Sequence, residues 1–358
     1  MSSAKKAAVY VAATRQHVGK TSTCLGLLQG LTSRIDNIGF LKPVGQQSVL
    51  VNDGALRVDK DVAVAKGSDL LCLTLIDGAC LVEIFHLKNC HYEDMSPVVI
   101  PPGYTREFLD GKITLESQLV KIRQSFEKIT AANDYTIVEG TGHTGVGSIV
   151  NINNARVAAE LGIDMVLIAN GGIGSAFDDL ALNYALCKDY GVKVRGVILN
   201  KVRPDKMEMV SEYFPKALKQ WDMPLIGVVP NLPSLANQSM LDFEGLFKTR
   251  LLSASSRRFQ QYTKTSLVTS GLRRFLVKLS SNKFNDTLFP PVDQPQDYIM
   301  EIIERSNAPV LYAPVTTFEA MEKITRFTAK FNPTDRQKVT ACGEHYAKFI
   351  NFDIILDR

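Results

Sequence analysis

The chain has 358 residues, of which 45% are hydrophobic and 22% charged, and its formal net charge is +4. This composition is typical of a folded globular protein and excludes a disordered, collagen-like or coiled-coil chain. The net charge is too small to indicate a nucleic-acid partner or a polybasic membrane anchor. A chain of this length is long enough for two domains, and one domain with appendages is the alternative.

The cysteines and the N-terminal residues indicate the compartment. Six cysteines lie far apart without a C-x-x-C pair, which predicts free thiols in a reducing compartment rather than disulfides or a zinc site. No stretch reaches the roughly 18 to 20 apolar residues that a membrane helix needs. The chain starts Met-Ser-Ser-Ala-Lys-Lys and runs directly into an apolar strand pattern, which leaves no room for a secretory signal. We therefore expect a cytoplasmic protein that does not span a membrane.

Short apolar runs, of the kind found in strands buried on both faces, alternate with helical patterns over residues 1–240. The expected strands are 7–12, 38–41, 135–138, 165–169, 194–199 and 225–229. The expected helices are 21–31, 115–132, 154–161, 178–189 and 206–220. Strands that alternate with helices pair in parallel through right-handed crossovers. The prediction is one α/β domain with a parallel sheet and helices on both faces.

The composition changes after residue 240. Between Glu244 and Asp286 there is no acidic residue, whereas nine residues are Lys or Arg. A run of like charges usually faces solvent, so residues 241–290 are predicted to form a basic connector. An anion-binding or partner-docking surface is the alternative.

A second, smaller α/β domain is expected over residues 291–358. The pattern predicts a helix over 296–305 and a strand over 310–313. Thr316 and Glu319 have the spacing of a capping box, which predicts a further helix.

Residues 14–21 read Thr-Arg-Gln-His-Val-Gly-Lys-Thr, which fits the G-x-x-x-x-G-K-[ST] phosphate loop except that Thr14 replaces the first glycine. A predicted strand precedes the loop and a helix begins at Thr21, so backbone N–H groups and the positive helix end converge there. Gly19 allows close approach of a phosphate, Lys20 supplies a positive charge, and the Thr21 hydroxyl is a ligand for phosphate-bound Mg²⁺. This context favours a nucleotide site over a chance Gly-Lys-Thr at a helix start.

Polar residues at other strand ends are further site candidates. Glu139 ends a strand before a glycine-rich stretch and is the first candidate for a metal-side acid. Asp61 is a second candidate, together with Asp59, although their segment is equally a solvated turn. Lys42 lies at the carboxyl edge, where open α/β sheets bind ligands, and is placed to hold an anionic intermediate. Asn200 has the donor and acceptor needed to read a purine edge, and the five histidines lack metal-ligand spacing.

These motifs carry a resemblance to dethiobiotin synthetase over residues 5–235. The segments that carry it are 14–21, Lys42-Pro43-Val44, 138–142 and Leu199-Asn200. Through residues 168–175 the chain is more similar still to the dethiobiotin-synthetase-like N-terminal region of long phosphate acetyltransferases. In that family a small regulatory domain of the DRTGG type follows, and residues 308–335 resemble its end. Residues 284–295 look shorter than the corresponding region, so this second domain is expected to be incomplete.

The resemblance implies ATP and Mg²⁺ as cofactors. It implies nucleotide contacts at Thr14, Val18, Gly19, Lys20, Thr21, Ser22 and Asn200, and metal contacts at Thr21, Glu139 and Asp61. Lys20 and Lys42 would be the catalytic residues, with Lys42 beside a carbamate. Dethiobiotin synthetase joins carbon dioxide to a diamine as that carbamate, phosphorylates it with ATP and closes a ring.

Three departures lie on the substrate side of the implied site. Arg15 stands where dethiobiotin synthetase has an acid, Gln46 replaces a small serine, and Ser96-Pro97-Val98 lacks the histidine that follows Ser-Pro. The nucleotide side is intact. The sequence therefore favours retained ATP binding with lost or changed chemistry.

The leading hypothesis is a nucleotide-dependent regulatory or sensor protein without the acetyltransferase domain. The alternative is an ATP-dependent ligase of the dethiobiotin synthetase type, and a third possibility is an assembly scaffold. The expected partners are the nucleotide, a small-molecule effector or substrate, and a second copy of the chain in a homodimer, with no membrane and no nucleic acid. The apolar segment 67–84 has no counterpart in the family and is read as an inserted strand, a partner surface or an error in the predicted gene product.

Overall fold

The computed structural model describes residues 7–51, 55–66, 85, 87–262, 287–289, 297–305, 308–327, 329, 331–332 and 335–358. The chain forms two compact units. The first comprises Met1–Asn231 and Phe331–Arg358, and the second Leu232–Lys330. Within the described residues, no helix combines the length and the apolar character that crossing a membrane requires.

The first unit is built on a six-stranded sheet with the order β10-β9-β8-β1-β7-β2. Its strands are β1 (Ala8–Ala13), β2 (Ile38–Leu41), β7 (Tyr135–His143), β8 (Met165–Asn170), β9 (Val194–Val202) and β10 (Leu225–Pro230). All neighbouring strands pair in parallel. Every residue of β1 is buried, as expected for a strand covered on both faces. The predicted α/β fold with a parallel sheet is confirmed.

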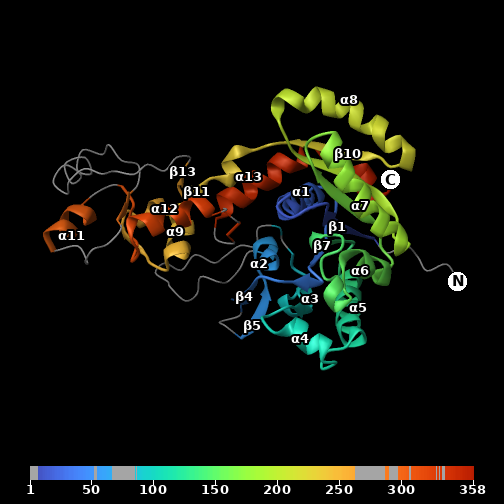
Figure 1. The fold of residues 1–358 in the computed structure, drawn as a ribbon, viewed down its shortest axis with the longest axis horizontal. Coiled ribbons are helices and arrows are strands. Elements are labelled where there is room, and N and C mark those ends of the chain that lie inside the picture. The colour runs from blue at the N-terminus through green and yellow to red at the C-terminus, as the bar shows by residue number, and fades with distance from the viewer. Residues whose placement is uncertain are drawn as a thin grey trace. The chain divides into compact units, whose positions relative to one another are not determined.

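Helices connect these strands and cover the sheet. They are α1 (Lys20–Thr32), α5 (Leu115–Ala132), α6 (Asn154–Leu161), α7 (Gly174–Asp189) and α8 (Met207–Leu218). The connection through α1 takes the chain toward the β2 edge of the sheet. The connections through α5, α6, α7 and α8 take it toward the β10 edge. Because crossovers are right-handed, α1 lies on the opposite face from the others. Figure 1 shows α1 on one side of the sheet and α5, α6 and α7 on the other.

The last helices of the chain, α13 (Arg336–Ala347) and α14 (Phe352–Leu356), cover the face that α1 occupies. A Cβ atom on Gly26 of α1 would lie 2.2 Å from the Tyr346 Cβ, so this glycine permits close helix packing. The Tyr135 hydroxyl donates a hydrogen bond of 2.6 Å to the Ile355 carbonyl. Residues 336–358 thus belong to the first unit, whereas the sequence analysis assigned them to a C-terminal domain. That boundary was wrong because residues packed against α1 are distant from it in sequence.

The second unit contains a three-stranded sheet and three described helices. Its elements are β11 (Gln238–Ser239), α9 (Met240–Phe247), β12 (Leu251–Ser253), β13 (Gln261–Tyr262), β14 (Thr287–Phe289), α11 (Asp297–Glu304), β15 (Val310–Tyr312) and α12 (Thr317–Arg326). The sheet order is β12-β15-β14. The helix and strand predicted near 296–313 are present, and Thr316 and Glu319 form the predicted capping box.

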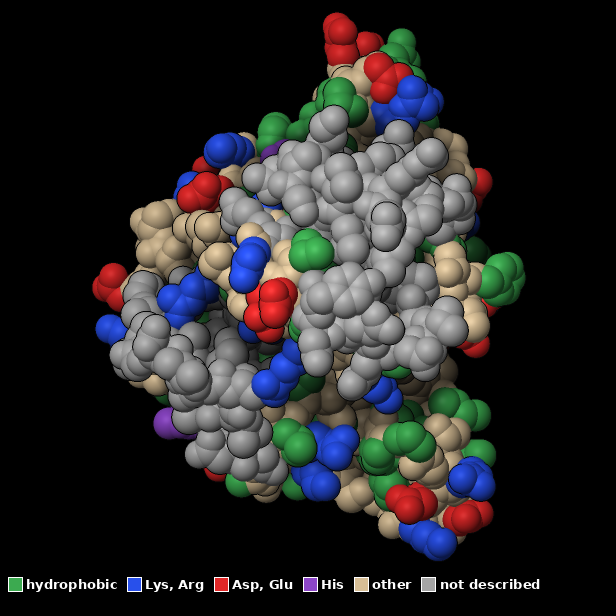
Figure 2. All heavy atoms as spheres, turned by 90° about the vertical axis from the view of Figure 1, so that its left-hand side faces the viewer, with side chains coloured by type: hydrophobic (Ala, Val, Ile, Leu, Met, Phe, Trp, Pro, Cys, Tyr) green, Lys and Arg blue, Asp and Glu red, His purple; other side chains and the backbone are tan. Residues whose placement is uncertain are grey.

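The predicted basic connector is in part folded structure. Residues 241–262 contribute α9, β12 and β13 to the second unit, and residues 263–286 lie outside the described residues. Arg258 Nη2 lies 2.6 Å from Glu244 Oε2. On the face shown in Figure 2, the described Lys and Arg side chains are interspersed with Asp and Glu side chains. The described part of this segment is therefore folded, and one of its arginines is paired with a carboxylate of the same segment.

Small elements complete the first unit near the β2 edge. They are β3 (Val44–Gly45), β4 (Ser48–Val51), β5 (Leu56–Asp59), α2 (Lys60–Lys66), α3 (Tyr92–Met95), β6 (Val98–Val99) and α4 (Tyr104–Leu109). Short 3₁₀ turns occur in the first unit at Ser148–Val150, Pro204–Lys206 and Lys219–Trp221, and in the second unit at Pro233–Ala236 and Ser255–Arg257. The apolar segment 67–84 lies outside the described residues.

Candidate functional site

The predicted phosphate loop connects β1 to α1. Two of its residues have left-handed backbone conformations, His17 with φ 60° and Gly19 with φ 102°. A Cβ atom on Gly19 would also lie 2.3 Å from the Asn200 Nδ2. Glycine is thus required at position 19 both by its backbone angle and by the close approach of Asn200.

Three side chains from other elements hold carbonyls of this loop. Asn183 Nδ2 donates to the Thr14 carbonyl at 2.9 Å, Asn200 Nδ2 to the Val18 carbonyl at 2.7 Å, and Lys201 Nζ to the His17 carbonyl at 2.6 Å. A carbonyl held by a donor fixes the orientation of its peptide plane. The shape of the loop is therefore set by α7 and by the end of β9.

Asn200 has a different environment from the one that the sequence suggested. Its side chain is fully buried, and its Oδ1 accepts a hydrogen bond of 2.8 Å from the Lys201 N–H. The amide is thus engaged with the protein backbone on both sides instead of being open to a purine edge. Asn183 and Lys201 were not predicted; the only sequence signal was the position of Asn200-Lys201 at a strand end.

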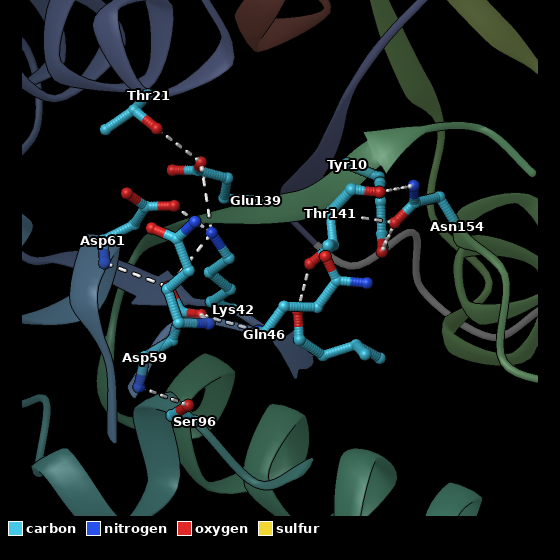
Figure 3. A network of polar contacts seen from close by, with 12 residues as sticks. Tyr10, Thr21, Lys42, Gln46, Asp59, Asp61, Ser96, Glu139, Thr141 and Asn154 are labelled. Atoms are coloured by element: carbon cyan, nitrogen blue, oxygen red, sulfur yellow. Dashed lines mark hydrogen bonds and ion pairs between the residues drawn. The ribbon is translucent and has the colours of Figure 1, made fainter. Parts of the chain in front are cut away.

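A cluster of charged side chains lies beside the loop (Figure 3). We call Lys42, Asp59, Asp61 and Glu139 the Lys42 cluster. Lys42 Nζ lies 3.1 Å from Asp59 Oδ1 and 3.6 Å from Glu139 Oε1, and it forms an ion pair with Asp61 Oδ2. Thr21 Oγ1 donates a hydrogen bond of 3.0 Å to Glu139 Oε1. The structure thus brings together the predicted residues Thr21, Lys42, Asp61 and Glu139.

Neighbouring elements position this cluster. Lys42 follows β2, and Glu139 lies in β7, which pairs with β2. Asp59 ends β5 and is 2% exposed. Its carboxylate accepts backbone hydrogen bonds from Gln46 at 3.0 Å and from Asp61 at 3.0 Å. The segment of Asp59 and Asp61 is therefore a built part of the site and not a solvated turn.

Burial and charge shift the titration of the cluster. Burial raises the pKa of Glu139 to about 7, although the charge of Lys42 opposes this shift. Burial alone would lower the pKa of Lys42, but the carboxylates of Asp61 and Glu139 raise it well above its usual value. Burial lowers the pKa of Lys20, against the attraction of Glu139. At neutral pH Lys42 therefore stays protonated, while Glu139 is near its midpoint.

The substrate-side departures occupy defined positions. Arg15 Nε lies 2.5 Å from Asp179 Oδ2, so a carboxylate of α7 neutralises this arginine. Ser96 Oγ accepts a hydrogen bond of 3.1 Å from the Asp59 N–H and helps to hold the Lys42 cluster. Gln46 lies beside the cluster in Figure 3.

The donor set fits a magnesium ion carried by a phosphate. Across the described residues, no three His, Cys, Asp or Glu side chains are placed to hold a metal ion by themselves. Mg²⁺ bound to a nucleotide needs only one or two protein oxygens, because phosphates and water supply the rest. Glu139 Oε2 is buried without a hydrogen-bond partner, and Thr21 Oγ1 contacts the other oxygen of the same carboxylate. Asp61 is paired with Lys42 instead.

Comparison with known proteins places this site in a family. Residues 7–239, more than half of the chain, match the sequence model of the AAA domain. The chain belongs to the AAA domain family. The match contains the phosphate loop and all members of the Lys42 cluster.

The AAA domain resembles two kinds of curated relative. It is 24% identical over 247 residues to the ATP-dependent dethiobiotin synthetase of Methanocaldococcus jannaschii, covering 67% of this chain and 100% of the relative. It is 23% identical over 226 residues to a probable cobyric acid synthase of Methanococcus maripaludis, covering 62% of this chain and 45% of the relative. The chain thus spans less than half the length of the cobyric acid synthase. The resemblance to dethiobiotin synthetase is confirmed at low identity, and that to phosphate acetyltransferases stays a prediction.

Solved structures show a weaker similarity. MinD of Pyrococcus horikoshii, complexed with Mg-ADP, gives a TM-score of 0.35 at 15% identity and covers 64% of this chain and 82% of its own. A plasmid partition protein of Borrelia burgdorferi gives a TM-score of 0.38 at 12% identity and covers 64% of this chain and 91% of its own.

We predict that Lys42→Met lowers the free energy of unfolding at pH 7 by about 3–5 kcal/mol, because it leaves the buried carboxylates of Asp59 and Glu139 and the partly exposed carboxylate of Asp61 without their cation. The loss should shrink as the pH falls to 5. In the variant, the carboxylates repel one another because Lys42 is no longer there to balance them. Protonation at the lower pH removes this repulsion. Urea unfolding at both pH values measures this.

Lys128→Met is the matched control. Lys128 Nζ lies 2.8 Å from Asp94 Oδ1, but its side chain is 67% exposed. Removing this exposed ion pair should cost less than about 1 kcal/mol. Equal losses of unfolding free energy in the two variants would contradict the prediction that burial makes the ion pairs of Lys42 more stabilising than an exposed ion pair.

Proposed function

We propose that this AAA domain protein binds ATP with Mg²⁺ at the phosphate loop. The observation that carries the proposal is the pairing of Thr21 with Glu139, whose second oxygen is buried without a partner. Lys20, the first residue of α1, directly precedes Thr21 and would contact the terminal phosphates. When bound, Mg²⁺ would neutralise charge on the phosphates.

The remaining contacts follow from the loop. Backbone N–H groups of the loop and of the start of α1 would bind phosphate oxygens, because a helix N-terminus carries unpaired donors and partial positive charge. Val18, Gly19 and Ser22 are the residues that supply this backbone, whereas the Thr14 N–H donates to the Ile168 carbonyl at 2.9 Å. A phosphate anion would also restore the charge balance of Lys20, whose pKa burial lowers.

Lys20→Ala is expected to remove most of the ATP binding, because Lys20 is the loop cation beside the terminal phosphates. Titration calorimetry with MgATP measures this, and thermal unfolding establishes that the variant is folded. Lys216→Ala is the control, since Lys216 is exposed on α8 and pairs with Glu212. Unchanged ATP affinity in folded Lys20→Ala protein would contradict the phosphate-loop assignment.

The Mg²⁺-dependent part of ATP binding is expected to tighten about tenfold from pH 6 to pH 8. The reason is that the pKa of Glu139 is raised to about 7, and only the ionised carboxylate is a good Mg²⁺ ligand. Glu139→Gln should lose this pH dependence while metal-free ATP binding stays the same. Equal pH dependence in the parent protein and Glu139→Gln would move the metal role to Asp61.

We further propose that the bound nucleotide serves a regulatory or sensor function. Two observations support this. The Lys42 side chain is 6% exposed and its ammonium group is engaged by carboxylates, so an anionic intermediate would have to displace them. The substrate-side residues Gln46 and Val98 also depart from the dethiobiotin synthetase pattern. On the same proposal, the second unit is related to the DRTGG domain that follows the N-terminal region of long phosphate acetyltransferases, and would take a small-molecule effector.

An ATP-dependent ligase of the dethiobiotin synthetase type is the second candidate function. It is favoured by the position of Lys42 at the carboxyl edge of the sheet, 3.6 Å from Glu139. The relative from Methanocaldococcus jannaschii, covered over its full length, also has this activity in its name.

Diaminononanoate with bicarbonate separates the two candidates. We expect no increase in ATP hydrolysis by this protein, because Lys42 is held by carboxylates and the substrate side has changed. Phosphate release measures the effect, and the dethiobiotin synthetase of Methanocaldococcus jannaschii assayed in parallel is the positive control. Stimulated phosphate release, or dethiobiotin detected by mass spectrometry, would overturn the sensor function and favour the ligase.

A further inference from the structure

Asn183 of α7 contacts two separate segments beside the nucleotide site. The residue is 7% exposed. Its Nδ2 donates a hydrogen bond of 2.9 Å to the carbonyl of Thr14, the first residue of the phosphate loop. Its Oδ1 accepts hydrogen bonds from the Thr144 N–H at 3.0 Å and from the Thr144 hydroxyl at 2.6 Å. One amide thus joins the phosphate loop to the residue that follows β7.

The hydrogen bonds of Asn183 fix the orientation of its amide. A primary amide has two N–H donors and one acceptor oxygen. Besides its bond to Thr14, Nδ2 donates to the Asp179 carbonyl at 2.8 Å, one turn earlier in α7. An amide turned by 180° would place its N–H donors against the Thr144 N–H and its oxygen against two carbonyls. The amide therefore fits its surroundings in one orientation only.

The strand β7 bulges just after Glu139. From Glu139 to His143 the pairing with β1 advances four residues along β7, while β1 itself advances only two. Such bulges are frequent beside active sites. Asn154 holds the bulge, because its Oδ1 accepts from the Thr141 N–H at 3.0 Å and its Nδ2 donates to the Thr141 carbonyl at 2.7 Å (Figure 3). The path of the chain from Glu139 to Thr144 is therefore defined by hydrogen bonds.

The phosphate loop and the segment 139–144 are thus joined at both of their ends. At one end, the Thr21 hydroxyl donates to Glu139 Oε1 at 3.0 Å. At the other end, Asn183 joins Thr14 to Thr144. The loop cannot move away from the segment at Thr14 without breaking the bonds of this amide. The distance between the phosphate loop and the segment that carries Glu139 therefore depends on Asn183.

We propose that Asn183 is a positioning residue of the nucleotide site, which holds the phosphate loop at a fixed place relative to the segment 139–144. This inference rests on the proposed ATP binding and adds to that site a residue that acts through backbone hydrogen bonds. The donor half of the amide holds the phosphate loop, and the acceptor half holds Thr144.

Asn183→Asp separates the two halves of the amide. An ionised carboxylate accepts hydrogen bonds but cannot donate them. This variant therefore keeps the bonds from Thr144 and loses the bond to the Thr14 carbonyl. Asn183→Ala loses the bonds to both segments, and it carries the comparison of ATP affinities if the buried carboxylate of Asn183→Asp prevents folding.

Asn153→Ala is the matched control. Asn153 is 3% exposed, and its Nδ2 donates to the hydroxyls of Ser148 and Tyr190, each at 3.3 Å. Its Oδ1 accepts a hydrogen bond of 2.8 Å from the Arg156 N–H. The control thus loses a buried amide with three hydrogen bonds, none of which joins the phosphate loop to Thr144.

The first measurement is NMR without nucleotide. The Thr144 N–H donates to Asn183, so its hydrogen exchange should be about five- to tenfold faster in Asn183→Ala and no faster than in the parent protein in Asn183→Asp. The Arg15 N–H shares a peptide group with the Thr14 carbonyl, so its signal should shift in both Asn183 variants. Neither change is expected in Asn153→Ala.

The second measurement is the Kd for ATP without Mg²⁺, which reports on the phosphate loop apart from the metal-side acid. It should rise about five- to tenfold in both Asn183 variants and stay unchanged in Asn153→Ala. Thermal unfolding establishes which variants are folded. A role of Asn183 in stability alone would leave the Kd of its folded variants equal to that of Asn153→Ala.

The outcomes separate this proposal from the one on which it rests. Equal Kd values in Asn183→Ala and Asn153→Ala would overturn the positioning role at the phosphate loop. An unchanged exchange rate of the Thr144 N–H in Asn183→Ala would overturn the link to the segment 139–144. A parent protein that binds no ATP, with the expected NMR changes in the Asn183 variants, would overturn the ATP proposal and leave Asn183 as the residue that joins the two segments.

Discussion

The handedness of the crossovers leaves one helix alone on its face of the sheet, and much of the first unit follows from this constraint. The helix is α1, the one that carries the phosphate loop at its start. A single helix cannot cover the face, so α13 and α14 return from the end of the chain to bury it. The close contact is made at glycines, Gly26 against Tyr346 and Gly30 against Phe352. The packing that completes the core thereby brings Tyr346 to the loop.

The loop is held from two sides by different kinds of interaction. On one side, the side chains of Asn183, Asn200 and Lys201 each donate a hydrogen bond to a backbone carbonyl of the loop, and these bonds determine its shape. On the other side, Thr21 leads to Glu139 and to the buried charges of the Lys42 cluster. Hydrogen bonds thus determine the shape of the loop, whereas the carboxylates determine the electrostatic potential beside it. The two sets meet at the first turn of α1, where phosphate and metal would be bound.

Local patterns predicted most of the sheet and part of the site. The bounds of α5 and α6 agree with the prediction because their periodic patterns end at clear caps. Glu139 and Lys42 were found because polar residues that follow buried strands of a parallel sheet converge at its carboxyl edge. Asp61, which comes after the antiparallel strand β5, was found only as an acid that follows a strand. The burial of Asn200 and the pairing of Arg15 with Asp179 depend on distant contacts, which no local pattern contains. One sequence signal for the packing of α13 against α1 was overlooked. It is the pair of glycines four residues apart in α1, at which a neighbouring helix approaches closely.

The second unit interrupts the first in the sequence, because Leu232–Lys330 stand between the two segments, Met1–Asn231 and Phe331–Arg358, that form the first unit. Asn231, just before it, donates from its backbone N–H to the Val202 carbonyl at 2.8 Å. After it, α13 brings the His345 Nε2 to 3.0 Å from the carbonyl of Pro230. Residues 232–330 are therefore a domain insertion, and the segments on either side of it contact each other within the first unit. A chain cut after residue 239 would lose α13, expose the face of α1 that this helix covers and remove Tyr346 from beside Gly26.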